Sequence, residues 1–146
     1  MTIERVYFDS SALVKVLVSR EVGAEFASEL FYSGGRQYTS RLSRPETVSA
    51  LSRRVRNREI SASDLREARL RFDQAWLRLN VIPVLDEYLD HAAELVLGYS
   101  LSGADAVHLA TALDMLPHGE MTFVTWDRRQ SEAAYALGFT VQPPID

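Results

Sequence analysis

The chain has 146 residues, of which 47% are hydrophobic and 25% charged, a composition typical of a folded globular protein with one sizeable core. It contains no cysteine, which excludes disulfides and thiolate sites, and it has neither an apolar run of about 18 residues nor a secretory-signal pattern, so we expect a cytoplasmic protein without a membrane span. The formal net charge of −4 argues against a protein that holds nucleic acid by bulk electrostatics alone.

Hydrophobic periodicity predicts alternating strands and helices. In chain order we expect a strand at 4–8, helices at 11–19 and 21–32, a strand at 37–40, helices at 43–58 and 63–79, a strand at 81–85, helices at 87–98 and 103–116, a strand at 121–126, a helix at 128–137 and a strand at 139–142. In the second helix, Val22, Phe26 and Leu30 lie on one face, which makes the helix amphipathic. The alternation indicates a single α/β domain over residues 1–146, with a mostly parallel central sheet.

Arginine is concentrated in one segment of the chain. Seven arginines and a single acid lie between residues 36 and 58, and Lys15 is the only lysine in the protein. Within this segment, "LSRRVRNRE" is either a solvent-exposed helix face or a phosphate-binding surface, for which the bidentate geometry of arginine is suited. On the second interpretation, Arg53 and Arg54 are the candidate phosphate contacts.

Four carboxylates occur where a parallel sheet places its ligands. Such ligands bind beyond the carboxyl ends of the strands, beside helix N-termini. The acids at these places are Asp9 after the first strand, Glu46 in the first turn of the third helix, Asp105 in the first turn of "SGADAVHLATAL", and Asp127 after "TFVTW". We therefore expect all four to meet at one edge of the sheet.

Helix capping is an alternative explanation for each acid taken alone. The positions are those of N-caps or capping boxes, namely Asp9, Asp127, Ser43-x-x-Glu46 and Ser102-x-x-Asp105. Acids at these places are also stabilised by the positive end of the helix dipole. Capping and ligand binding are both open interpretations when each acid is considered separately.

Convergence of the four acids favours a cation at the same place. Like charges brought together repel and raise one another's pKa, and a metal ion removes this difficulty. Ligands that are all oxygen favour a hard ion such as Mg²⁺ or Mn²⁺. We expect Asp9 to anchor the metal while Ser10 or Ser11 caps the first helix in its place.

Four stretches of the chain, in this order, resemble the signature regions of PIN-domain ribonucleases, most closely the VapC-type toxins of bacterial and archaeal toxin–antitoxin pairs. They are "VYFDSSALVK", "RPETVSALSRR", "SGADAVHLATA" and "FVTWDRR…AAYALGF", and the similarity spans residues 5–141. The resemblance implies a three-layer α/β/α PIN-like domain with a parallel sheet. It also implies a Mg²⁺- or Mn²⁺-dependent endoribonuclease that hydrolyses RNA phosphodiesters through metal-activated water.

By position, the resemblance implies a catalytic role for Asp9, Glu46, Asp105 and Asp127. Asp9 and Asp105 would bind the principal metal ion. Asp127 would complete that site or help to hold a second ion. Glu46 would orient or deprotonate the attacking water.

Three further residues near the acids have expected roles. Ser11 and Thr125 match the supporting polar positions of the family. His108 follows Asp105 by three residues, and we expect it to be a hydrogen-bonded packing residue and not a metal ligand.

The resemblance also implies protein partners. VapC-type proteins are usually homodimers, and a cognate VapB-type antitoxin usually holds them inactive. The C-terminal segment of the antitoxin commonly lies in a groove near the first helices, which in this chain would be formed by residues 11–19, 21–32 and 43–58.

Two other function classes account for parts of the pattern. A non-catalytic RNA- or protein-binding domain on the same fold is disfavoured because all four acids are intact. An aspartate-dependent phosphatase is disfavoured because a haloacid-dehalogenase-like site needs an aspartate where this chain has Ser11. A receiver domain needs a lysine late in the chain, and Lys15 comes too early.

Overall fold

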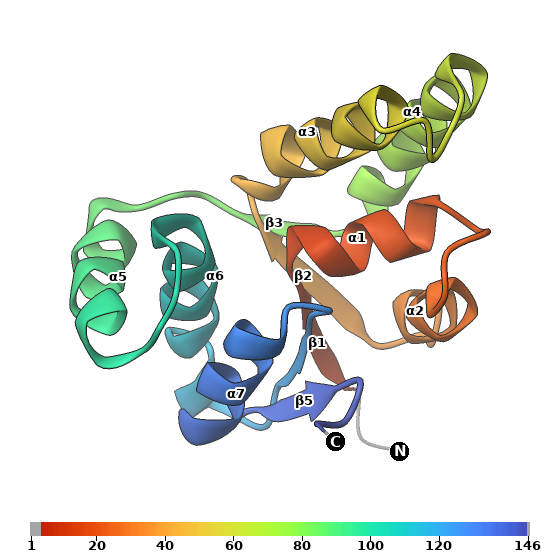
Figure 1. The fold of residues 1–146 in the computed structure, drawn as a ribbon. Helices are drawn as coiled ribbons and strands as arrows, with labels where there is room; N and C mark the ends of the chain where they lie inside the picture. Colours follow the sequence, from red (N-terminus) through yellow and green to blue (C-terminus); the bar gives the residue numbers. More distant parts are fainter. Residues whose placement is uncertain (1–3, 146) are drawn as a thin grey trace.

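Five strands form one parallel sheet at the centre of the protein in the computed structural model, which describes residues 4–145 (Figure 1). The strands are β1 (Arg5–Phe8), β2 (Arg36–Ser40), β3 (Asn80–Ile82), β4 (Thr122–Val124) and β5 (Thr140–Gln142). Their order across the sheet is β3-β2-β1-β4-β5, and every neighbouring pair is parallel. The predicted parallel α/β sheet is confirmed.

Helices cover both faces of the sheet (Figure 1). One face carries α1 (Ser10–Leu17), α2 (Ala24–Phe31), α3 (Ser43–Arg56) and α4 (Ala62–Arg78), and the other carries α5 (Asp86–Gly98), α6 (Gly103–Leu113) and α7 (Arg128–Ala136), with a short 3₁₀ helix, η1 (Leu116–His118), before β4. The three-layer α/β/α architecture is therefore confirmed. Among residues 4–145, no helix is both long and apolar enough to cross a membrane.

The central strand β1 divides the hydrophobic core in two. Successive side chains of a strand point to opposite faces of its sheet. Val6 and Phe8 accordingly pack with α1–α4, whereas Tyr7 packs with α5–α7, and all three are completely buried. Because both faces of β1 are covered, the strand is apolar throughout this run, as parallel strands in α/β proteins are.

The chain reverses its direction of travel across the sheet at β1. From β1 it proceeds to β2 and β3 on one side, and it then returns to β4 and β5 on the other side. The carboxyl ends of β1 and β4 therefore lie beside a topological switch point, where open parallel sheets bind their ligands. Asp9 follows β1 directly, and Asp127 begins α7 after β4.

The apolar face expected for α2 is only partly buried. Val22 is 91% exposed and precedes the helix, and Phe26 is also exposed, but Leu30 packs against the core. The fully buried residues of the helix are Ala24, Ala27 and Phe31. The helix begins only after Gly23, whose positive φ of 93° sets the direction of the chain. Trp126 packs directly against Gly23, where an added Cβ would lie 2.8 Å from Nε1 of the indole. The buried residues Ala24, Ala27 and Phe31 therefore lie one to two positions after the expected Val22, Phe26 and Leu30.

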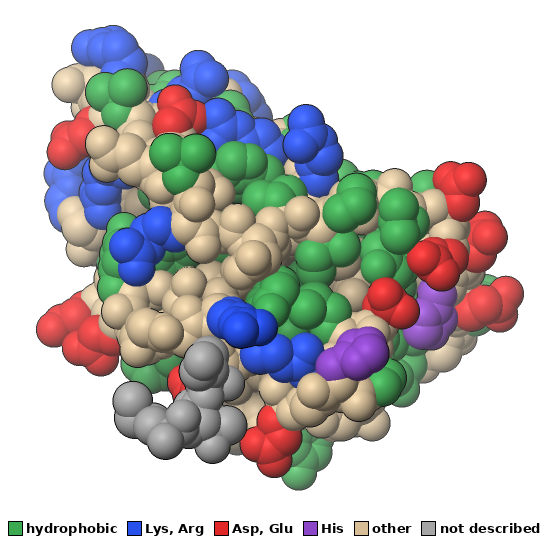
Figure 2. Space-filling model, turned by 180° about the vertical axis from the view of Figure 1, so that it is seen from behind, with side chains coloured by type: hydrophobic (Ala, Val, Ile, Leu, Met, Phe, Trp, Pro, Cys, Tyr) green, Lys and Arg blue, Asp and Glu red, His purple; other side chains and the backbone are tan. Residues whose placement is uncertain are grey.

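Charge is distributed unevenly over the surface. Figure 2 shows lysine and arginine side chains gathered over the α3–α4 end of the molecule, while acidic side chains gather at the α5 end. The acids on α5 are Asp86, Glu87, Asp90 and Glu94. Although the net charge is −4, positive charge is therefore concentrated at the α3–α4 end of the protein and negative charge at the α5 end.

We expect Gly35→Ala to lower the free energy of unfolding by about 1–3 kcal/mol, because a Cβ there would lie 2.6 Å from the backbone oxygen of Glu4. Urea denaturation measures the change. Gly98→Ala is the matched control, since nothing lies within 4 Å of its Cβ position and the substitution should change stability by less than about 1 kcal/mol. Equal stability of the two variants would contradict the close approach of residue 35 to β1.

Candidate active site

Asp9 is a buried carboxylate held by three hydrogen bonds. Its Oδ1 accepts from the backbone N–H of Ala12 at 2.9 Å and from Ser11 Oγ at 2.7 Å, and its Oδ2 accepts from Thr125 Oγ1 at 2.5 Å. The bond from Ala12 makes Asp9 the N-cap of α1. The prediction that Ser10 or Ser11 caps this helix is therefore wrong, because Ser11 donates its hydroxyl to Asp9 and the carboxylate itself closes the helix.

The hydroxyls of Ser11 and Thr125 extend this network to α7. Ser11 Oγ accepts from the backbone N–H of Trp126 at 2.9 Å, and Thr125 Oγ1 accepts from the backbone N–H of Asp127 at 3.0 Å. Asp127 Oδ1 accepts in turn from the backbone N–H of Gln130 at 3.0 Å, which makes Asp127 the N-cap of α7. The network fixes the start of α1 and the start of α7 relative to each other.

Gln130 connects the network to α6. This side chain is completely buried, and its Nε2 donates to the backbone oxygen of Asp105 at 3.0 Å. Asp105 lies in the first turn of α6, where Ser102 Oγ accepts from the Asp105 backbone N–H at 3.1 Å. Ser102 is therefore the N-cap predicted by the capping-box spacing, and the partly exposed Asp105 carboxylate is not needed for that bond.

Three carboxylates from α6, α7 and the end of β1 influence one another electrostatically. Burial, followed by the negative charges of Asp127 and Asp9, raises the pKa of the Asp105 carboxyl to about 6. Burial also raises the pKa of Asp9, although His108 and the hydrogen bonds from Thr125, Ser11 and Ala12 act in the opposite direction. The structure therefore brings these three predicted residues into one electrostatic neighbourhood.

Glu46 is bound to His108 and does not form the predicted capping box. Glu46 Oε1 lies 2.6 Å from His108 Nε2, and the side chain of Glu46 is 23% exposed. Ser43 Oγ forms a hydrogen bond with Thr39 Oγ1 at 2.6 Å, and the N-cap residue of α3 is Leu42, which makes no side-chain capping bond. The alternative interpretation of Ser43 and Glu46 as a capping box therefore does not hold, because both side chains are bonded to other elements.

The donor atoms at this edge of the sheet fit a hard divalent cation by their chemistry. They are carboxylate oxygens, and burial together with the charges of Asp127 and Asp9 raises the pKa of Asp105, so a positive counter-charge there would favour its ionised form. As the side chains stand, however, no three acids or histidines within residues 4–145 come together as a complete metal-binding group. The assignment of Asp9 and Asp105 as metal ligands therefore stays a prediction.

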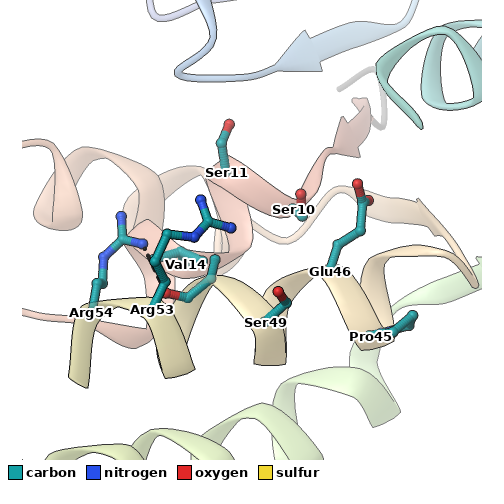
Figure 3. A pocket seen from close by; sticks show the side chains of 9 residues that line it. Ser10, Ser11, Val14, Pro45, Glu46, Ser49, Arg53 and Arg54 are labelled. Carbon is teal, nitrogen blue, oxygen red and sulfur yellow. Dashed lines mark hydrogen bonds between the residues drawn. The ribbon is translucent and has the colours of Figure 1, made fainter. Parts of the chain in front are cut away.

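A pocket of about 560 Å³ lies between α1 and α3, next to this network. Figure 3 shows Ser10 and Ser11 on its α1 side, with Glu46, Ser49 and Arg53 on its α3 side. The pocket therefore contains a carboxylate, Glu46, near the start of α3 and a guanidinium, Arg53, near its end. Its hydroxyl and guanidinium groups give it the polar lining expected of a site for an anionic ligand.

Arg53 and Arg54 are neighbours in sequence but differ in their contacts. Arg54 binds Glu21 through both Nε and Nη2, and Lys15 Nζ also lies 3.1 Å from Glu21 Oε1. Burial raises the pKa of Glu21, but hydrogen bonds from Arg54 and Lys15 outweigh it and hold the pKa below its ordinary value. Arg54 is therefore engaged in a partly buried ion pair between α3 and the segment after α1.

The structure thus has a parallel α/β/α sheet with acids at its carboxyl edge, each beside a helix start. A profile of the PIN domain family matches residues 6–135. Ribonuclease VapC45 and ribonuclease VapC49, from two strains of Mycobacterium tuberculosis, are each 37% identical over 138 residues, which is 94% of this chain and 94% of each relative. The chain therefore belongs to the PIN domain family, as a relative of the VapC ribonucleases.

Solved structures have the same fold at low sequence identity. Mycobacterium tuberculosis VapC20, a sarcin-ricin loop cleaving toxin, has a TM-score of 0.65 at 20% identity, with 92% of this chain and 95% of that chain covered. A toxin–antitoxin complex from Klebsiella pneumoniae has a TM-score of 0.63 at 20% identity, with 97% and 98% covered. FitAcB from Neisseria gonorrhoeae has a TM-score of 0.64 at 16% identity, with 93% and 95% covered.

Sequence reasoning missed two residues of the network. Gln130 stands three residues after Asp127, at a helix start, and nothing in the sequence indicates that its side chain reaches α6. Tyr7 Oη lies 2.8 Å from His108 Nδ1. The sequence signal for Tyr7 was its spacing, because residues two apart in a strand point to the same face of the sheet and Tyr7 stands two residues before Asp9. The prediction that His108 is a hydrogen-bonded residue is confirmed by its two partners.

We expect Asp105→Asn to stabilise the metal-free protein at neutral pH. The folded state raises this pKa from 3.8 to about 6, so ionisation destabilises the fold progressively as the pH rises through that range. The carboxyl is partly exposed, and solvent screening reduces the expected gain at pH 7 to about 1 kcal/mol. Urea denaturation in EDTA at several pH values measures it.

The gain should shrink as the pH falls below about 6 and disappear below about pH 3, where the carboxyl is protonated in both the folded and the unfolded state. Asp90→Asn, the same change on the exposed face of α5, should give no comparable gain. An Asp105→Asn protein that is less stable than the parent at pH 7 would contradict the electrostatic coupling of the three aspartates.

Proposed function

We propose that the chain is a Mg²⁺- or Mn²⁺-dependent endoribonuclease, the toxin of a VapBC-type toxin–antitoxin pair, with residues 1–146 as a single PIN-like domain. The observation that carries the proposal is the hydrogen-bond network that brings Asp9, Asp105 and Asp127 to one edge of the sheet beside the α1–α3 pocket. Two relatives at 37% identity are named ribonucleases, which supports cleavage of RNA.

Asp9 and Asp105 are the proposed metal ligands, with Asp127 and Glu46 in supporting positions. A divalent cation held by these residues would supply a water of lowered pKa and would neutralise charge that builds up on the phosphate. The chain's own hydroxyls prepare this site, because Ser11 and Thr125 fix both oxygens of Asp9 in one orientation. Each oxygen of an ionised carboxylate has two lone pairs, so Asp9 retains capacity for a ligand besides these hydrogen bonds.

Glu46 is the proposed base or orienting group for the attacking water. Its Oε1 is bound to His108, so Oε2 is the oxygen that we assign to the water. The side chain extends from α3 along the wall of the pocket that also contains Ser10 (Figure 3). RNA that occupies this pocket would bring a phosphate between Glu46 and the aspartates, with Arg53 beside a neighbouring phosphate.

We propose a cognate VapB-type antitoxin and a second copy of the chain as protein partners, in the cytoplasm. Structural neighbours include a toxin–antitoxin complex from Klebsiella pneumoniae and VapBC2 from Rickettsia felis, whose chain is 14% identical with a TM-score of 0.62, covering 88% of this chain and 91% of that chain. The exposed Phe26 on α2 contacts Trp126 and provides apolar surface near the first helices, where the antitoxin segment is expected.

We expect the purified protein to cleave RNA in the presence of Mg²⁺ or Mn²⁺ and to lose this activity in EDTA. Asp9→Asn should lower the cleavage rate by at least on the order of 10²-fold, because a metal contributes several kcal/mol to stabilising the transition state. Asparagine is an equally good N-cap, so α1 should remain folded. Denaturing gel electrophoresis of end-labelled RNA measures the rate.

Asp90→Asn serves as the control, since it makes the same chemical change on the exposed face of α5 and should cleave at the parent's rate. Asp9→Asn that cuts RNA as fast as the parent would remove the central residue from the proposal. Metal-independent cleavage by the parent would remove the cofactor.

We expect Arg53→Ala and Arg54→Ala to differ. Arg53→Ala should weaken RNA binding and reduce the slope of log K against log salt by about 0.7 if one phosphate contact is lost. Arg54→Ala should mainly lower protein stability, because Glu21 loses one of its partners. Fluorescence anisotropy with labelled RNA in EDTA, where cleavage is suppressed, measures binding.

An Arg53→Ala protein with the parent's affinity and salt slope would show that this arginine is a solvent-exposed helix residue without an RNA contact. Thermal unfolding of both variants separates a loss of binding from a loss of folded protein.

A further inference from the structure

A chain of hydrogen bonds connects the deepest part of the sheet to the carboxylate of Glu46. Tyr7 Oη lies 2.8 Å from His108 Nδ1, and His108 Nε2 lies 2.6 Å from Glu46 Oε1. The three residues come from β1, α6 and α3, so the chain crosses the sheet layer from one side to the other. Tyr7 and His108 are completely buried, whereas Glu46 reaches the pocket.

Glu46 and Tyr7 set the direction of the hydrogen bonds that His108 makes. An ionised Glu46 accepts only, so His108 Nε2 must carry a hydrogen and donate to it. If the imidazole is neutral, Nδ1 then accepts from the hydroxyl of Tyr7, and if it is cationic, Nδ1 donates to the same hydroxyl. In both protonation states, Tyr7 satisfies Nδ1 and thereby holds Nε2–H toward Glu46.

Tyr7, the buried end of these hydrogen bonds, is held rigidly. Tyr7 stacks on Phe123 of β4 with ring centroids 5.1 Å apart and planes inclined by 13°. Its ring is also in a T-shaped arrangement with the His108 ring, with centroids 5.8 Å apart. Its strand, β1, is paired on both sides. A glutamate side chain has three rotatable bonds and loses rotamer freedom when it is fixed, so a buried partner reduces the number of orientations that Glu46 adopts in the pocket.

We propose that Tyr7 and His108 are positioning residues that hold the Glu46 carboxylate toward the substrate pocket, an inference that rests on the ribonuclease function proposed above. Neither side chain reaches the substrate, because both are completely buried. They act through Glu46, in the way that outer residues orient a ligand or base in other active sites. The buried histidine in "ADAVHLATA" therefore has a role beyond packing.

The test compares cleavage by the parent with that by His108→Leu, His108→Gln and Tyr7→Phe under saturating Mg²⁺. We expect His108→Leu to lower kcat by about 100-fold and Tyr7→Phe to lower it by about tenfold, with KM changed by less than about twofold. His108→Gln restores a donor near the position of Nε2 and should recover about tenfold of the loss. In the His108→Leu background, Tyr7→Phe should cause no further loss, because Tyr7 acts through the imidazole.

Tyr88→Phe is the matched control. It removes a hydroxyl that donates to Asp114 at 2.9 Å in the same half of the core, remote from the network, and should leave kcat unchanged. If His108→Leu does not fold, Tyr7→Phe still decides the question, because phenylalanine keeps the stacking on Phe123. A kcat equal to that of the parent, for Tyr7→Phe or for a folded His108→Leu, would overturn the positioning role.

A second measurement does not depend on activity. In ¹⁵N NMR spectra, His108 of the parent should show a protonated Nε2, and Tyr7→Phe should shift the nitrogen resonances toward a mixture of tautomers. If the parent cleaves no RNA, the proposed function fails, and an Nε2 that is unprotonated in the parent would overturn the orientation of Glu46 as well. If the parent cleaves RNA and the Tyr7→Phe and His108→Leu variants cleave it at the same rate, the positioning role fails and the proposed function stands.

Discussion

The buried carboxylate of Asp9 is the constraint on which the rest of the site depends. Asp9 is 2% exposed, and an ionised carboxylate removed from water is strongly destabilising unless donors surround it. Its donors are the Ala12 amide and the Ser11 and Thr125 hydroxyls, one of which lies 116 residues away in sequence. Satisfying this one group therefore fixes the start of α1 against the end of β4 and, through Thr125, the start of α7.

Capping and ligand chemistry are combined at this edge of the sheet. Asp9 and Asp127 close α1 and α7 with one carboxylate oxygen each. Asp105 is different, because Ser102 caps its helix and its own carboxylate is left near two other negative charges. Burial and these two charges disfavour the ionised form of Asp105, and a cation bound there, as proposed above, would favour it.

The two faces of the sheet contribute different parts of the site. The α1–α3 face provides the polar pocket and the partly buried ion pairs of Glu21 with Arg54 and Lys15, which hold the arginine segment against the segment after α1. The α5–α7 face provides Asp105 and the imidazole of His108. Glu46 is the meeting point, since it extends from α3 and is bound by a residue of α6.

The order of strands and helices, the parallel sheet and the four helix-start acids followed from the sequence, because hydrophobic periodicity and strand–helix alternation are local signals. Local signals did not fix which polar atoms pair. Ser11 bonds Asp9 instead of capping α1, Ser43 bonds Thr39, and Glu46 bonds His108 at a separation of 62 residues. These pairings were decided by tertiary structure, because several donors of equal local propensity compete for each carboxylate and only the packing of distant elements brings one of them within hydrogen-bonding distance.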